Sequence, residues 1–527
     1  MVYPMAETET PVETIARLMR APLKKMSKGE AISSVGHLID LATDLSDDAA
    51  ITRAFVQLRS LERFDLTPAG LALLHYFRAN AWHGRRLIRT HAGPRAWEQP
   101  ERQEQIIELL RARNHDGFVG LPKERRCQIL TNLGLQFLEV GRFIEAIAFW
   151  DEALGLIPNF AMALGSRGTG FRYYGIGCED RYDRMVLLMT AHRSFAASIA
   201  ADAHWDSEYP DWVAATFATD AEKIAEAFDV DAIETGFSPD TGSLGCSGEE
   251  QDYRRWCLRH RLFLNPLNDV TGRSVAASDP LMLPGIVAGF EVEGVPPLIG
   301  FFNQMKQEYA HARHMLFESR SEDQTHYADR RVHLHNTFDY PSYSIYAERA
   351  RTAFRLAYGL LDKIGYFINH YWGLGSDAHR VGFRSVWYAD AEAARGLHSR
   401  FQGYENWPLV GLFWLAKDLF DEQFQRVTNP DAREIFVLRN SLEHKYLQLH
   451  DEWGAGRGAI SSGGFGISIN RHAFEVKALC VLKMARAALI YLVLAVRREE
   501  HLRRAGNEEP LISMQMLLSR FEDRWKR

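Results

Sequence analysis

Apolar residues recur at helical spacing along most of the chain, and short Gly- or Pro-rich breaks separate one run from the next. In the first part of the chain, this spacing predicts helices over residues 31–47, 48–64, 69–89 and 102–113. In the last part it predicts helices over 301–320, 343–371, 408–424, 431–453 and 468–498, with an irregular segment over 373–406. Residues 286–292 fit a short strand. The pattern therefore predicts an all-α protein.

Gly, Pro, Ser and Asn become dense between the two helical parts, over residues 236–297. A change of this kind marks a domain boundary. We expect four regions: a helical repeat domain over 1–235, an irregular connector over 236–297, a helical bundle over 298–500, and a charged tail over 501–527 with a short helix near 510–525.

The clearest repeat covers residues 127–159. Gly134 and Ala146 are small where two helices would cross closely, Phe137 and Trp150 would fill the space between them, and a proline ends the second helix. The signature residues are Leu133, Gly134, Phe137, Ala146, Trp150, Ala153 and Pro158. This pattern resembles the tetratricopeptide repeat (TPR), with Leu130 where that family usually has Trp. A degraded second copy follows over 164–195, with an insertion expected near 175–184. The resemblance implies a TPR-like α-solenoid; a generic helical bundle is the alternative.

Composition and charge exclude several classes of protein. Of the 527 residues, 46% are hydrophobic and 25% charged, which is typical of a globular chain and not of a disordered one. The formal net charge of -6 argues against coating nucleic acid by bulk charge. From Pro430 to Arg527 there are 16 Lys/Arg and 12 Asp/Glu, so this segment carries +4 and the remainder -10. The two ends are therefore expected to have different roles.

The compartment is inferred from the cysteines and the apolar stretches. The five cysteines are scattered without CxxC spacing, which favours free thiols in a reducing compartment over disulfides or a thiolate zinc site. The N-terminus lacks an apolar signal core. The longest apolar stretch, Val476–Val496, contains Lys477, Lys483 and Arg486, and is expected to be a buried helix and no membrane span. We therefore expect a cytoplasmic protein.

Candidate chemistry is concentrated in one predicted helix, at Arg439, Asn440 and His444. An Arg, a polar Asn and a His after four intervening residues resemble the RNase motif of the HEPN superfamily, whose domains are four- or five-helix bundles. The resemblance covers roughly residues 297–498. It implies metal-independent endoribonuclease activity, in which an RNA 2′-OH attacks the adjacent phosphate and leaves a cyclic phosphate. His444 would act as general base or acid, because histidine has an ordinary pKa of about 6.5. Arg439 would hold the phosphate and stabilise its developing charge. Asn440 would orient either the imidazole of His444 or the phosphate.

The helical period separates the two charged members of this motif. At about 100° per residue, Ile435, Leu438, Leu442, Tyr446 and Leu449 form a core stripe, and His444 lies on the opposite side. Phe436, Val437 and Leu447 share that opposite side, which suggests that a partner covers it. Arg439 lies about 140° from His444, so two copies facing each other across a two-fold axis would complete one site. This agrees with the HEPN resemblance, which implies a homodimer or higher homo-oligomer.

Several further residues are predicted around this motif. Lys445, Lys477, Lys483 and Arg486 are candidates for RNA contact, and a solvated helix face is the equal alternative for the last three. Tyr446 stands where some HEPN toxins have a tyrosine that a partner nucleotidyltransferase modifies, although its place on the core stripe favours packing. No cofactor is implied, and no metal site, because His311 with His314 and His333 with His335 lack a carboxylate pattern.

The resemblance also sets the expected partners and role. They are an RNA substrate, a protein or small-molecule ligand on the TPR-like domain, and an antitoxin, with no membrane. The protein would act as a toxin or antiviral defence effector. The alternatives are a non-catalytic TPR/HEPN adaptor and a nucleotide-sensing regulator that dimerises through the bundle. Arg439 and Glu443 could also form a simple surface ion pair.

Overall fold

A computed structural model describes residues 10–89, 97–206, 211–230, 242–286, 297–320, 325–425, 430–450, 461–463, 466–505 and 522–526. The helices of the first part are α1 (Pro11–Met19), α2 (Lys28–Asp44), α3 (Asp48–Leu61), α4 (Pro68–Arg89), α5 (Pro100–Asn114), α6 (Lys123–Glu139), α7 (Phe143–Leu156), α8 (Ala161–Gly177), α9 (Arg181–Ser198) and α10 (Asp211–Ala227). Those that follow are α12 (Gly248–Arg259), α13 (Pro297–Glu318), α14 (Ile345–Tyr371), α15 (Trp407–Phe420), α16 (Glu422–Gln425), α17 (Pro430–His444) and α18 (Arg471–Ala505). The strands are β1 (Tyr446–His450), β2 (Ser461–Gly463) and β3 (Gly466–Asn470).

The protein is all-α apart from this small sheet, as predicted. N-terminal caps stabilise the start of many of the helices. In these caps, side chains accept hydrogen bonds from backbone N–H groups that have no partner within the helix. Thr10 and Ser27 form capping boxes with glutamates three residues later. Asp180, Ser344 and Asn406 cap α9, α14 and α15. The expected strand at 286–292 and most of the expected terminal helix at 510–525 lie outside the described residues.

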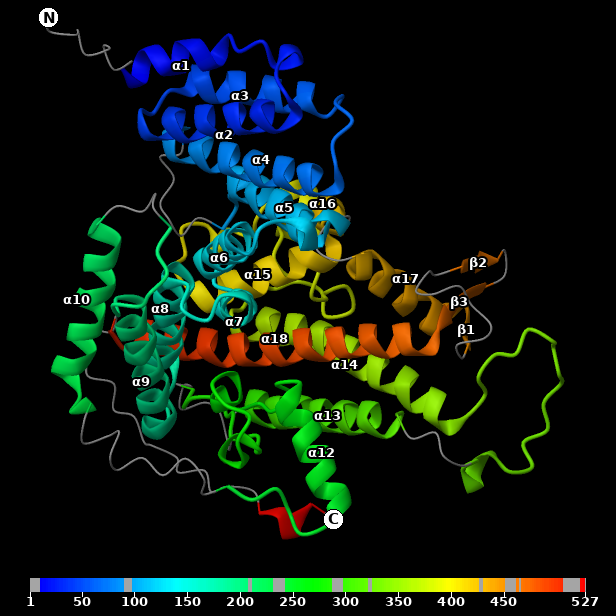
Figure 1. Ribbon diagram of the computed structural model, residues 1–527. Coiled ribbons are helices and arrows are strands. Elements are labelled where there is room, and N and C mark those ends of the chain that lie inside the picture. The colour runs from blue at the N-terminus through cyan, green and yellow to red at the C-terminus, as the bar shows by residue number, and fades with distance from the viewer. Residues whose placement is uncertain are drawn as a thin grey trace, which may run out of the picture.

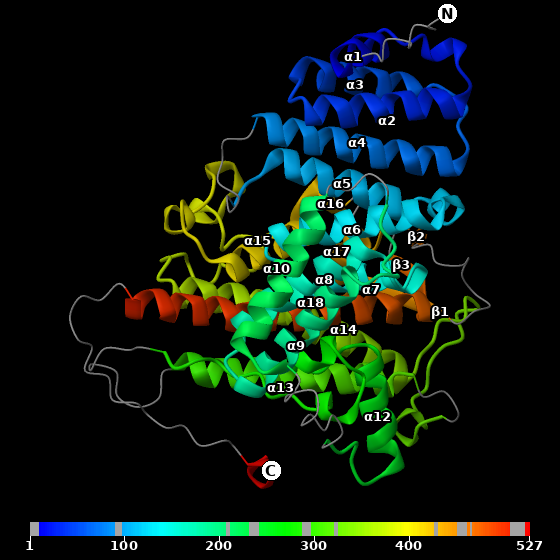
Figure 2. The same cartoon turned by 60° about the vertical axis from the view of Figure 1, so that its left-hand side comes forward.

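Figure 1 shows how the helices are layered. Helices α1 to α5 stack above the body, and α18 crosses the middle between α6, α7 and α15 on one side and α13 and α14 on the other. The turned view in Figure 2 shows the same order. Helix α18 is long and apolar enough to suit a membrane span, but 78% of its most apolar window is buried among the other helices. It is the central core helix of this fold.

The repeat at 127–159 is a pair of antiparallel helices, α6 and α7. A Cβ atom on Gly134 would lie 2.4 Å from the Trp150 indole nitrogen, so only glycine lets the two helices approach this closely. The Trp150 indole N–H donates to the Thr131 carbonyl at 3.2 Å. The second copy repeats this packing, with Gly168 against the ring of Phe195. The expected insertion near 175–184 forms no separate loop, because α8 and α9 are separated by only three residues, 178–180, and the other residues of the insertion belong to these two helices. Assignment of these pairs to the TPR family stays a prediction.

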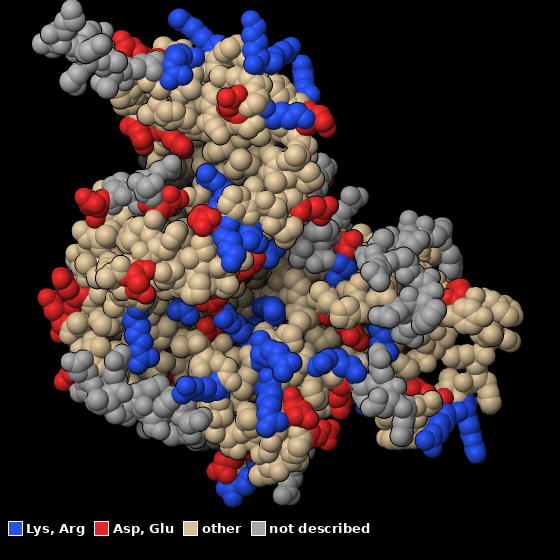
Figure 3. All heavy atoms as spheres, viewed as in Figure 1, with Lys and Arg blue, Asp and Glu red and all other residues tan. Residues whose placement is uncertain are grey.

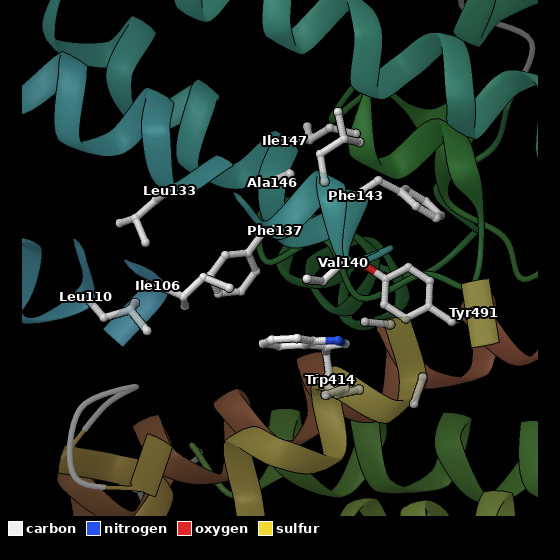
Figure 4. Packing of buried hydrophobic residues seen from close by; sticks show 14 of the residues in the cluster. Ile106, Leu110, Leu133, Phe137, Val140, Phe143, Ala146, Ile147, Trp414 and Tyr491 are labelled. Atoms are coloured by element: carbon white, nitrogen blue, oxygen red, sulfur yellow. The ribbon is translucent and has the colours of Figure 1, made fainter. Parts of the chain in front are cut away.

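The turn between α6 and α7 inserts into the C-terminal helices. Gly141 has a φ of +83°, and a Cβ there would lie 2.3 Å from the Trp407 carbonyl oxygen. Arg142 forms a buried ion pair with Asp418 of α15 at 2.6 Å. Figure 4 shows Trp414 and Tyr491 pointing from the C-terminal helices toward Phe137, Val140 and Phe143 of the repeat. The two helical parts therefore share one core at this seam.

One hydroxyl at the seam supports a stability prediction. The buried Tyr491 hydroxyl donates to the Glu145 carboxylate and accepts a hydrogen bond from the Ile144 N–H at 3.0 Å. Tyr491→Phe is expected to lower the free energy of unfolding by about 1–3 kcal/mol, because both partners lose their hydrogen bond in a buried place. Urea denaturation of the full chain measures this change. Tyr366→Phe, at a tyrosine that is 43% exposed, is the matched control and should change stability by less than about 0.5 kcal/mol. Equal stability of the two variants would contradict the prediction.

The segment 242–286 is irregular, as expected, but it also forms helix α12 and packs into the body. The sequence pattern did not predict α12, whose first turn is capped by Ser247. Asp269 forms a buried ion pair with Arg486 of α18 at 2.8 Å, and Leu264 and Leu267 are buried. This part of the connector is therefore a structural layer over α18, and it is held by charge pairing as well as by apolar contact.

Candidate active site

Helix α17 packs its apolar stripe inward and ends at the predicted motif. Ile435, Leu438 and Leu442 are buried, as the helical period predicted. The predicted helix over 431–453 is too long, because α17 ends at His444 and the chain continues as β1. Strand β1 pairs in parallel with β3 and satisfies its backbone groups there. The last two residues of the predicted stripe, Tyr446 and Leu449, therefore lie in a strand.

The described members of the motif, Arg439 and Asn440, are half-buried on the last turns of α17. The Arg439 guanidinium donates to the Asn440 side-chain oxygen at 3.1 Å. His444 is the last residue of the helix, four residues after Asn440. The side chains of His444, Glu443 and Phe436 lie outside the described residues, so the roles of His444 and the alternative Arg439–Glu443 ion pair stay predictions. Val437 is half-buried against the core.

Helix α14 supplies the surroundings of Arg439. The guanidinium carbon of Arg439 lies 5.7 Å from the centre of the Tyr358 ring of α14, within the range of a cation–π interaction. Burial raises the pKa of Tyr358, and the positive charge of Arg439 opposes this shift. Burial also raises the pKa of Asp362. The Phe383 N–H, which donates to its carboxylate, and the charge of Arg439 both act in the opposite direction and lower this pKa. The aromatic ring therefore supports the arginine from the side of the domain core.

Two further arginines of α14 hold the junction between α17 and β1. Arg355 donates to the Leu442 carbonyl at 2.6 Å, and Arg351 donates to the Leu447 carbonyl at 3.0 Å. Cations at the C-terminal end of a helix satisfy its free carbonyls and complement its dipole. Neither arginine was predicted as part of the site. Their spacing of four residues, which puts them on one face of α14, was the available signal.

The structure separates the predicted RNA contacts into two groups. Lys445 and Lys483 are exposed. Lys477 and Arg486 are buried and form ion pairs with Glu434 at 2.5 Å and with Asp269 at 2.8 Å. The prediction of RNA contact by Lys477 and Arg486 is therefore wrong. The two ion pairs connect α18 to α17 and to the segment 242–286.

Lys483 belongs to a basic cluster that the sequence did not reveal. Burial lowers the pKa of His260 at the end of α12, and the nearby charges of Lys483, Arg320 and Arg259 add to this effect. The guanidinium of Arg320 also lies 5.8 Å from the Trp256 ring. Figure 3 shows Lys and Arg side chains around a hollow in the middle of the face that it displays. Convergent cations of this kind favour an anionic ligand.

Tyr446 is exposed, which differs from the expected packing role. Its side chain is 37% exposed, and its hydroxyl lies 3.0 Å from the hydroxyl of Tyr343. Gln448 also donates to the Tyr446 hydroxyl at 3.2 Å. This change follows from the end of α17, because the first residue of β1 no longer faces the core.

Within the described ranges, no group of three or more His, Cys, Asp or Glu side chains could hold a metal ion. The glycines between Gly165 and Gly170 let helices pack closely. Gly165 lies against Phe217, and Gly170 lies against Trp150.

Comparison with known families bears on the C-terminal part of the chain. Residues 290–499 match the family described as LA2681-like HEPN, which supports a HEPN-superfamily domain there. This range contains α13 to α17, the sheet and most of α18. A HEPN domain indicates nuclease or RNA-related activity. Searches of curated proteins and of solved structures found no match.

Proposed function

We propose that the chain is a metal-independent endoribonuclease whose active site is shared by two HEPN domains. The observation that carries this proposal is the position of Arg439, Asn440 and His444 at the end of one helix inside the HEPN match. Arg439 is half-buried, supported by the Tyr358 ring and joined to Asn440. An arginine held in this way can bind a phosphate with its planar fork of donors.

The proposed reaction needs groups that hold a phosphate and move protons. The RNA 2′-oxygen forms a bond to phosphorus while the bond to the 5′-oxygen breaks. A histidine takes the proton from the 2′-OH, and a second proton reaches the leaving 5′-oxygen; two copies supply a His444 for each transfer. Arg439 stabilises the additional negative charge on the phosphate. The products are a 2′,3′-cyclic phosphate and a 5′-hydroxyl.

Product chemistry tests this proposal directly. The purified full-length chain is incubated with tRNA and with total RNA in EDTA, and cleavage is followed on denaturing gels. We expect cleavage in EDTA, with new 5′ ends that a polynucleotide kinase labels without prior dephosphorylation. A requirement for Mg²⁺ would contradict the metal-independent mechanism. Absence of cleavage under all conditions would favour the adaptor or the nucleotide-sensing regulator.

Regulation is proposed to act through the seam between the two helical parts. A cleft of about 900 Å³ lies between α6 and α8 of the repeat part and the C-terminal half of α18. Its walls include the apolar side chains of Tyr173, Ile176 and Trp407 and the cationic groups of Arg498 and His501. A small molecule or a peptide would fit a space of this size. Such a ligand would contact both parts at once, as a toxin or defence effector with a trigger requires. Modification of the exposed Tyr446 hydroxyl by a partner enzyme is a second regulatory route in this proposal.

A further inference from the structure

A tight turn between α14 and α15, residues 382–387, lies against the Tyr358 face of α14. Tyr358 and Asp362 are four residues apart and therefore share one face of this helix. The Phe383 N–H of the turn donates to the Asp362 carboxylate at 3.2 Å. A Cβ atom on Gly365, one turn further along the same face, would lie 2.7 Å from the Phe383 nitrogen. Glycine at this position therefore lets the backbone of the turn lie directly on α14.

The turn is fixed by its own side chains. The Ser385 hydroxyl accepts a hydrogen bond from the Gly382 N–H at 3.0 Å, and the Trp387 indole N–H donates to the Phe383 carbonyl at 2.7 Å. Phe383, Val386 and Trp387 are completely buried. These contacts give the turn one defined position on the core of the domain.

Arg384 is the exposed residue at the centre of this otherwise covered turn. Its guanidinium carbon lies 6.0 Å from the centre of the Phe420 ring at the end of α15, and α15 packs against α17. Within the described part of the chain, its guanidinium forms no ion pair and no hydrogen bond. The positive charge of Arg384 is therefore held in place and remains available to a ligand.

Arg384 and Arg439 reach the same tyrosine from different elements. The Tyr358 ring lies 5.7 Å from the guanidinium carbon of Arg439. Burial and the charge of Asp362 raise the pKa of Tyr358, and the charges of Arg439 and Arg384 both act in the opposite direction. The geometry agrees, because the turn that carries Arg384 is bonded to α14 one helical turn after Tyr358. The candidate site thus contains a second, exposed cation beside the motif arginine.

We propose that Arg384 binds the RNA phosphate next to the one that Arg439 holds. This inference rests on the proposed function, which supplies the ligand. An RNA strand carries a phosphate on every nucleotide, so a strand bound at Arg439 presents a neighbouring phosphate to a second cation. A guanidinium suits this contact, because its planar donors match the phosphate oxygens. Binding of the neighbouring phosphate would position the bond that is cut.

Equilibrium binding tests this contact without cleavage. The full-length protein is titrated into a fluorescent 2′-O-methyl RNA oligonucleotide in EDTA, and anisotropy gives the Kd at several salt concentrations. The methyl group removes the nucleophile of the proposed reaction, so this probe binds and is not cut. Arg384→Ala is expected to raise the Kd about tenfold. It should also reduce the slope of log K against log salt by about 0.7, the value of one phosphate contact on a single strand.

Two variants control for effects on the fold and for general loss of charge. Arg384→Lys should keep the wild-type salt slope, because the positive charge remains. Arg395→Ala, in the same segment, removes an arginine that is 55% exposed and paired with Glu392 at 3.4 Å. It should change the Kd by less than about twofold, because surface ion pairs contribute little. In cleavage assays, Arg384→Ala should raise KM and leave kcat nearly unchanged, whereas loss of Arg439 lowers kcat.

The outcomes separate this contact from the nuclease proposal. A wild-type Kd for Arg384→Ala, or weaker binding with an unchanged salt slope, would overturn the contact and leave the nuclease proposal intact. A smaller mass of Arg384→Ala by light scattering, with an unchanged salt slope, would also overturn it, because Arg384 would then join two copies of the chain. A salt slope that depends on Arg384, without RNA cleavage, would support the contact and reject the nuclease. Absence of RNA binding by the wild type would overturn both.

Discussion

Replacing His444 with alanine is expected to lower the rate constant of RNA cleavage by about 10²–10⁴-fold. In the proposed reaction a histidine carries the proton that leaves the 2′-OH or reaches the 5′-oxygen, and alanine can do neither. Single-turnover cleavage of a fluorescent RNA in EDTA measures the effect. His379→Ala, at an exposed histidine in the irregular segment of the same domain, is the matched control and should cleave at the wild-type rate. Cleavage by His444→Ala at the wild-type rate would reject the nuclease proposal.

Arg439 provides an independent test of the same site. Arg439→Ala is expected to slow cleavage by about 10²–10³-fold, as loss of a transition-state donor does in other enzymes. Arg439→Lys should restore little of the rate, because a lysine ammonium lacks the planar fork of the guanidinium. Thermal unfolding shows whether the fold is retained. Recovery of the full rate with lysine would indicate that Arg439 contributes only general positive charge.

Replacing Asp269 with alanine is expected to lower the free energy of unfolding by about 3–5 kcal/mol. Asp269 accepts two hydrogen bonds from Arg486, at 2.8 and 2.9 Å, and both side chains are almost completely buried. Burial alone would lower the pKa of Arg486, but the charge of Asp269 overrides it and keeps this pKa raised. Without Asp269, the guanidinium would remain buried with two neutral acceptors, the Phe263 and Asn265 carbonyls, and no carboxylate in place of Asp269. Chemical denaturation of the full chain measures the loss.

Two further variants separate the ion pair from a general effect of substitution. Asp252→Ala removes a carboxylate that is 72% exposed and paired with Arg255 on the surface of α12, and should change stability by less than about 1 kcal/mol. Asp269→Ala combined with Arg486→Met should be more stable than Asp269→Ala alone, because no charge is then left unpaired in the core. If the double variant is less stable than the single one, the buried charge is not the cause.

These contacts change the expected relation between the domains. The sequence predicts a helical repeat domain, an irregular connector and a HEPN-like bundle in series. The structure instead places Arg142 of the repeat against Asp418 of α15, and Tyr174 of α8 against Asp269 of the connector. In the proposed regulation, a ligand at the seam would alter the packing of α15 and α18, and the Lys477–Glu434 ion pair joins α18 to α17. The repeat part would then act on the candidate active site through direct contacts.

The wrong predictions share one physical cause. Tyr446 and Leu449 continue the stripe of Ile435 and Leu438, so the helical period predicts a helix over Tyr446–His450. Its strand pairing depends on β3, which follows about twenty residues later in the chain. Lys477 and Arg486 are predicted as RNA contacts because a charge within an apolar helix suggests a ligand when no partner is visible nearby in the sequence. Their partners, Glu434 and Asp269, lie too far away in the sequence to be recognised from local spacing.

The sequence by itself determined the features that depend on neighbours within a few turns of the chain. It specified the helices through their apolar period and caps, the close crossing at Gly134 and Trp150, and the placement of Arg439, Asn440 and His444 on one helix. Only the tertiary structure decided where α17 ends, that residues 242–286 form a packed layer, which cations are buried, and that residues 331–340 are exposed. Each of these depends on pairing between residues far apart in sequence, where a hydrogen-bonded strand or a compensated charge has a lower free energy than the locally preferred alternative.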